Sequence, residues 1–110
     1  QQGLLGNAIE LWLQTAGGEW RHRQIECPIG EGIHLADIDA DRDLDIVAGQ
    51  RWYENAGDAL QGAWQPHVYA PAYEHRDVFP WAADINRDGR LDIVLMPTEK
   101  KLQHYRAVWY

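Results

Sequence analysis

The sequence lacks a second cysteine, a long apolar run and a surplus of basic residues. Cys27 stands alone, so no disulfide can form within the chain, and we expect a buried, unreactive thiol. No apolar run approaches the roughly 20 residues that a membrane-spanning helix needs. The net charge of −7 is opposite to what a phosphate backbone attracts. Nucleic-acid binding and a membrane span are therefore not expected.

Motifs of several enzyme classes are also missing. The chain has no Gly-rich phosphate loop, no nucleophile elbow, no Cys-x-x-Cys pair and no His-Glu-x-x-His motif. Its 110 residues, 45% of them hydrophobic and 25% charged, suffice for one folded domain. The acidic residues are concentrated, because residues 37–45 contain five Asp and one Arg. Such a charge density favours a bound cation over a merely solvated surface.

A twelve-residue segment occurs twice. Residues 36–47 read Ala-Asp-Ile-Asp-Ala-Asp-Arg-Asp-Leu-Asp-Ile-Val, and residues 83–94 read Ala-Asp-Ile-Asn-Arg-Asp-Gly-Arg-Leu-Asp-Ile-Val. Eight of the twelve positions are identical, at an offset of 47 residues. Weaker echoes relate the Trp–His pair at 20 and 22 to the pair at 64 and 67. A period in the forties with turns between short strands is typical of β-propeller blades.

Alternation of apolar and polar residues predicts an all-β chain without long helices. Nine strands are expected, near 8–14, 19–26, 33–38, 44–49, 51–56, 64–69, 79–85, 91–96 and 103–110. They form about two blade equivalents of antiparallel strands, too few to close a ring. We divide the chain into an outer half-blade (1–32), a full blade with a metal loop (33–77) and a partial blade with a metal loop (78–110).

The two repeated loops predict calcium sites. Oxygen side chains stand at loop positions 1, 3, 5 and 9, and calcium prefers six to eight such ligands. Position 7 would add a backbone carbonyl. An EF-hand is excluded, because its position 12 requires Glu and its flanks require helices. The predicted ligands are Asp37, Asp39, Asp41, Asp43 and Asp45 in the first loop, and Asp84, Asn86, Asp88, Arg90 and Asp92 in the second.

The pattern Asp-x-Asp-x-Asp-x-x-Leu-Asp-Ile-Val, followed by Trp-Tyr-Glu-Asn, resembles the FG-GAP or VCBS-type repeat of integrin-α-like β-propellers. Residues 33–69 resemble nearly a whole repeat, 78–110 most of another, and 7–26 the outer half of one. The resemblance implies a calcium-binding propeller, which we expect outside the cytoplasm (extracellular or periplasmic), although this chain carries no signal peptide. The first loop departs from the family with Ala40 and Arg42 where Gly is usual, and position 6 commonly needs a left-handed backbone.

Incomplete blades leave two interpretations open. The chain is either a fragment of a longer propeller or a homo-oligomer in which strands 79–96 of one copy pair with 8–26 of another. We expect a binding module for carbohydrate or protein, with Trp81, His34 and His75 as ligand contacts and no catalytic residue assigned. The alternative is part of a polysaccharide lyase or hydrolase, with a His and a Tyr acting as acid and base. His22 and His67 are expected to have structural roles instead.

Overall fold

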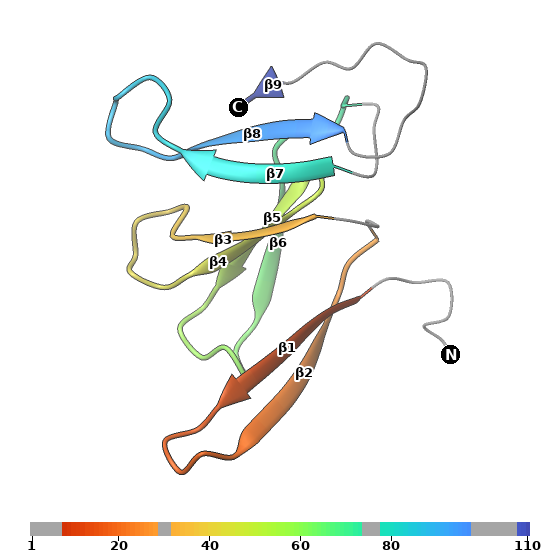
Figure 1. Cartoon of the computed structure of the whole chain (residues 1–110), viewed down its shortest axis with the longest axis vertical. Coiled ribbons are helices and arrows are strands. Elements are labelled where there is room, and N and C mark those ends of the chain that lie inside the picture. Colours follow the sequence, from red (N-terminus) through yellow and green to blue (C-terminus); the bar gives the residue numbers. More distant parts are fainter. Residues whose placement is uncertain (1–7, 29–31, 74–77, 98–107) are drawn as a thin grey trace.

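The computed structural model describes residues 8–28, 32–73, 78–97 and 108–110, and these form nine β-strands and no helix (Figure 1). The strands are β1 (Ala8–Gln14), β2 (Trp20–Glu26), β3 (Ile33–Ala36), β4 (Asp45–Ala48), β5 (Arg51–Asn55), β6 (Trp64–Val68), β7 (Val78–Ala83), β8 (Asp92–Pro97) and β9 (Val108–Trp109). All nine predicted strands are confirmed. The last is shorter than predicted within the described residues, since 98–107 lie outside them.

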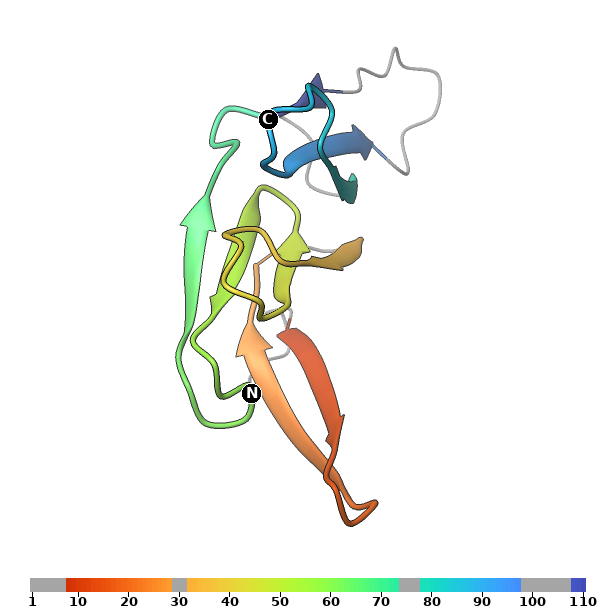
Figure 2. The same ribbon diagram turned by 90° about the vertical axis from the view of Figure 1, so that its left-hand side faces the viewer.

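The strands form three antiparallel sheets, with the orders β1-β2, β3-β4-β5-β6 and β7-β8-β9. Figures 1 and 2 show the sheets following one another along the longest axis of the molecule, with the four-stranded sheet in the middle. None of the sheets closes into a barrel. The all-β fold class is therefore confirmed, whereas the division at residues 32 and 77 and closure through a second copy stay predictions.

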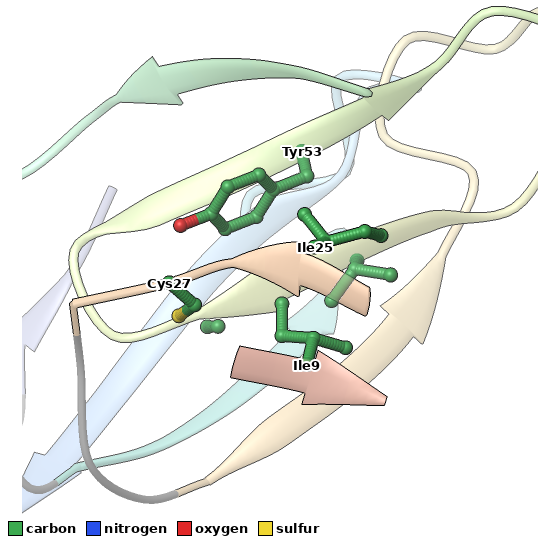
Figure 3. Packing of buried hydrophobic residues seen from close by; sticks show 6 residues of the cluster. Ile9, Ile25, Cys27 and Tyr53 are labelled. Atoms are coloured by element: carbon green, nitrogen blue, oxygen red, sulfur yellow. The ribbon is translucent and has the colours of Figure 1, made fainter. Parts of the chain in front are cut away.

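The first hydrophobic core lies between the β1-β2 sheet and the four-stranded sheet (Figure 3). Ile9 and Ile25 are cross-strand partners, so their side chains share one face of the hairpin. Together with Cys27 they pack against residues of β4 and β5, including Tyr53. The thiol of Cys27 is buried and unpaired, as expected.

The second core lies between the four-stranded sheet and the β7-β8-β9 sheet. Val47 of β4 packs there with Val78, Ile93 and Leu95. Strand β4 thus contributes to both cores, and all four of its residues are buried. This double burial explains why its sequence continues as Ile-Val-Ala instead of alternating with polar residues.

Apolar side chains remain exposed where a neighbouring sheet would sit. Ile33 and Leu35 of β3 are 49% and 53% exposed, and within the described residues the sheet that faces them has only the strands β1 and β2. At the other end of the molecule Phe79 and Met96 are cross-strand partners on one face, 58% and 54% exposed. The two outer sheets therefore present unfinished surfaces.

The β1-β2 hairpin and the β5-β6 hairpin each contain a stacked tryptophan–histidine pair. Trp12 lies over His22, with ring centroids 4.3 Å apart, and Trp52 lies over His67 at 4.4 Å. The histidines nevertheless lie on opposite faces of their hairpins. His22 is two residues beyond Trp20, whereas His67 is three beyond Trp64, and one residue of difference reverses the face. The Trp–His pair therefore occurs in both hairpins but lies on a different face in each.

Candidate metal centre

Asp45 anchors the first Asp-rich loop, which connects β3 to β4. Its side chain is fully buried, and its two carboxylate oxygens accept hydrogen bonds from the backbone N–H groups of Ile38 (2.8 Å) and Asn55 (2.9 Å). These bonds join the loop to β5. Burial raises the pKa of Asp45. The two hydrogen bonds act in the opposite direction, because they favour the ionised form.

Asp37 organises the tip of the same loop. Its two oxygens accept hydrogen bonds from the backbone N–H groups of Asp41 (3.0 Å) and Arg42 (2.9 Å). Asp41 in turn accepts a bond from the N–H of Asp43 (2.9 Å). Each carboxylate oxygen has a second lone pair, so these bonds leave capacity for a cation.

Three carboxylates of this loop converge. Asp37, Asp39 and Asp45 offer ligand oxygens that all lie within 4.8 Å of one another. Calcium binds oxygen at about 2.3–2.6 Å, so one ion can touch oxygens separated by this distance. The donor set therefore fits the metal that the sequence predicts.

Asp39 shows the electrostatic consequence of this convergence. Its pKa is raised to about 6, by loss of hydration and by the neighbouring carboxylates of Asp45 and Asp41. Because the side chain of Asp39 is exposed, the like charges of its neighbours matter more than the loss of hydration. A bound cation would reverse exactly that repulsion and hold Asp39 ionised.

The second loop, between β7 and β8, repeats this hydrogen-bond pattern. Asp84 accepts bonds from the N–H groups of Asp88 (3.1 Å) and Gly89 (2.9 Å), and Asp88 accepts one from Arg90 (2.9 Å). Asp92 accepts a bond from the N–H of Ile85 (2.8 Å), as Asp45 does from Ile38. The residue that would correspond to Asn55 lies outside the described part of the chain.

The position-3 residue of the second loop is an amide. Asn86 accepts a long bond of 3.3 Å from the N–H of Asp88. The groups of three or more acidic, His or Cys ligands found among the described residues all lie at the first loop. The second loop thus keeps the fold of the first with less negative charge.

The backbone of each loop is left-handed at two positions. At position 6, φ is 79° for Arg42 and 92° for Gly89, which confirms the expected conformation. At position 4, φ is 63° for Ala40 and 62° for Arg87. A side chain at such a φ costs about 1–2 kcal/mol, so three of these four residues are strained for the sake of the loop shape.

Sequence reasoning missed Glu54. This residue of β5 forms a second acidic group with Asp39 and Asp41, whose ligand oxygens also lie within 4.8 Å of one another. His67 is its hydrogen-bond partner, with 2.8 Å between Nε2 and Oε1. The sequence feature that could have revealed Glu54 is the Trp-Tyr-Glu-Asn segment, because Glu54 and Asn55 both lie beside the first loop.

Two of the three predicted ligand contacts meet. The rings of His34 in β3 and Trp81 in β7 lie 4.4 Å apart between centroids, and Trp81 is 59% exposed. His75, the third, lies outside the described residues. The predicted carbonyl ligands of Asp43 and Arg90 stay predictions.

The enzyme alternative gains no support from two of the histidines. His22 and His67 are hydrogen-bonded to Glu10 and Glu54, respectively, and each stacks on a tryptophan. These are the contacts of structural side chains.

Comparison with known proteins gives one match. The family model of the FG-GAP-like repeat matches residues 37–95, which include both loops and are more than half of the chain. No curated protein and no solved structure matches. FG-GAP repeats are typical of extracellular proteins. In the part of the chain that the structure describes, no helix has the length and apolar character of a membrane span.

Proposed function

The chain belongs to the FG-GAP-like repeat family, and we propose that it is a calcium-stabilised part of a β-propeller that serves as an extracellular interaction module. The convergence of Asp37, Asp39 and Asp45 carries this proposal, because three carboxylates within 4.8 Å repel one another unless a cation lies between them. Asp41 and Glu54 add further oxygens at the same loop. Such a set of hard oxygen ligands suits calcium better than zinc or copper.

The role of calcium would be structural. An ion that binds the folded chain stabilises it by mass action, by about 2.7 kcal/mol when its concentration is 100 times the dissociation constant. Two bound ions would also reduce the net charge from −7 to about −3. The backbone bonds to Asp37 and Asp45 hold the loop shape, so the ion would bind a largely preformed site.

Isothermal titration with calcium tests this proposal directly. We expect binding to the wild-type chain and a loss of at least tenfold in affinity for Asp39→Asn, since this change removes a carboxylate from both acidic groups. Asp43→Asn is the matched control, because its predicted contribution is a backbone carbonyl. Absence of calcium binding by the folded wild-type chain would overturn the proposal.

The ligand of the module would be a carbohydrate or a protein, contacted by the His34–Trp81 pair. These rings belong to neighbouring sheets, and the exposed indole offers an apolar surface of the kind found at binding sites. A Trp81→Ala variant should lose ligand binding and retain calcium binding. His75 remains a third candidate contact.

The exposed apolar residues beside the β1-β2 sheet and on the β7-β8-β9 sheet favour a second copy of the chain as a further partner. Exposed Leu35 beside the β1-β2 hairpin, and exposed Phe79 and Met96 on the last sheet, would be covered if β7 and β8 of one copy completed the hairpin of another. Within the described residues, the segment of β9 and Tyr110 pairs with β8 over three residues, and it is the strand that β1 would displace. Light scattering with calcium and with chelator measures the assembly. A monomer at every concentration would refute it.

A further inference from the structure

A cavity of about 580 Å³ lies between β2 and the strands β5 and β6 of the four-stranded sheet. Its volume is within the usual range of small-ligand sites, about 300–1,000 Å³. It is separate from the two Asp-rich loops and from the His34–Trp81 pair, since its lining contains none of those residues. The residues that matter for its chemistry are Arg23, Ile25, Arg51, Tyr53, Trp64 and Pro66.

Two arginines give this cavity a positive character in an acidic chain. Within the described residues, neither Arg23 nor Arg51 takes part in a salt bridge. Arg23 is held in place by hydrogen bonds from Nη1 to the carbonyl oxygens of Ala59 (3.2 Å) and Gly62 (2.7 Å). A guanidinium has five N–H donors, so the others remain for an anion. Its planar geometry suits a carboxylate.

Tyr53 brings an unpaired hydroxyl group to the same cavity. Its side chain is 2% exposed, and its Oη makes no hydrogen bond of normal geometry. Figure 3 shows this oxygen at the end of the ring where Cys27 lies, and Cys27 also lines the cavity. Burial, and then the neighbouring thiol, raise the pKa of Tyr53 to about 12. The guanidinium of Arg51 acts in the opposite direction and lowers this pKa, so Arg51 lies near the same hydroxyl group.

A buried polar atom without a partner costs about 1–3 kcal/mol. Folded proteins rarely retain such an atom unless water or a ligand satisfies it. The Oη atom of Tyr53 is shielded from solvent, so a molecule in the cavity would not reach it, and the charged side chain beside it is Arg51. Tyr53 therefore forms part of the cavity wall, and the polar contacts for a ligand come from the arginines.

The third feature of the cavity is its apolar wall. The indole of Trp64 is fixed by a hydrogen bond from Nε1 to the carbonyl oxygen of Ala59 (3.0 Å), and the ring is only half-buried. Ile25 and Pro66 complete this wall. A ligand that fits must therefore combine a carboxylate with a flat, partly apolar body. Glu26 also lines the cavity, from the exposed face of β2, so that the two arginines leave an excess of one positive charge in the lining.

We propose that this cavity binds a uronic-acid unit of an acidic oligosaccharide, with the carboxylate facing Arg51 and the sugar ring against Trp64. The inference rests on the proposed interaction module and names a ligand class for it. It adds a second binding surface, between the first two sheets, to the one proposed at the His34–Trp81 pair.

Tryptophan fluorescence and isothermal titration with tri-galacturonic acid test the proposal, with a neutral trisaccharide and sodium acetate as comparison probes. We expect binding of the acidic trisaccharide alone. Arg51→Ala should weaken it at least tenfold and Arg51→Lys less, because lysine keeps the charge but loses the bidentate geometry. Tyr53→Phe should leave it unchanged, because the hydroxyl group of Tyr53 is shielded from the cavity. Arg21→Ala is the matched control, since Arg21 is an exposed arginine of β2 outside the cavity.

Each outcome decides a separate point. Equal binding of acetate would overturn the sugar and leave a simple anion site. Equal binding of the neutral trisaccharide, or full affinity in both Arg51 variants, would overturn the role of the carboxylate. A chain that binds calcium but not the acidic trisaccharide would overturn this inference and leave the proposed function standing.

Discussion

Replacing Asp45 with asparagine separates the two roles that this residue would have, as an anchor of the loop and as a metal ligand. The carboxylate accepts one backbone N–H on each oxygen, at 2.8 and 2.9 Å. An asparagine of the same shape keeps one acceptor and turns an NH₂ group toward the other N–H. One bond to a charged acceptor is lost, and one buried N–H is left unsatisfied.

The expected cost can be worked from these contacts. A hydrogen bond to a charged group contributes about 1.5–3 kcal/mol. Part of this is offset, because burial raises the pKa of Asp45 and so disfavours its charge in the metal-free protein. We therefore expect Asp45→Asn to lower the free energy of unfolding by about 1–2 kcal/mol in chelator, which lowers the melting temperature by roughly 5–15 °C. In calcium at 100 times the dissociation constant, the difference should grow by about 2–3 kcal/mol.

Urea unfolding followed by circular dichroism, with calcium and with chelator, measures both differences. Asp43→Asn is the control, since it changes the charge of the same loop without removing an observed side-chain acceptor. Equal stabilities of Asp45→Asn and wild type in chelator would refute the anchoring role. A difference that does not grow with calcium would refute the ligand role.

Four further changes have expected outcomes that follow from the structure. Gly89→Ala should cost about 1 kcal/mol in urea unfolding, because φ is 92° while the space around the added carbon is empty. Arg42→Gly should have the opposite sign and a smaller size, since glycine also gains entropy when unfolded. Tyr53→Phe should leave the free energy of unfolding unchanged or raise it slightly, and a loss above 1 kcal/mol would mean that its hydroxyl is already bonded. Leu35→Ser should weaken self-association in light scattering while calcium affinity stays unchanged.

The strands were predictable because the repeat and the alternation are local signals. Spacing along the chain fixed the Asp-rich loops between two strands, and the left-handed position 6 followed from where Gly89 stands. The face of each histidine was not predictable from the echo. Which face His22 and His67 occupy depends on the register of two separate hairpins, and a difference of one residue reverses it.

The acidic cluster of the candidate metal centre was predictable from the sequence, and the contacts that support it from β5 were not. Alternating Asp residues placed Asp37, Asp39 and Asp45 in one loop, and the structure brings these three together. Glu54 and the backbone of Asn55 reach the loop from β5, a contact between distant parts of the chain. Such contacts depend on how β4 and β5 pair, which no spacing within the loop reveals.

In both loops, some of the oxygen-bearing side chains hold the backbone in shape, and others mainly contribute charge. Positions 1 and 9 accept backbone N–H groups in both loops, so they are required for the loop shape whether or not a metal binds. Position 3 has little part in that shape, which explains why Asn86 can replace an aspartate without loss of the fold. The first loop has a net charge of −4 and the second −1 over equivalent nine-residue segments. We therefore expect calcium to bind the first loop more tightly, and Asn86→Asp to strengthen the weaker of two sites in a titration. Two sites of equal affinity, unchanged by this substitution, would show that backbone geometry and not charge sets the affinity.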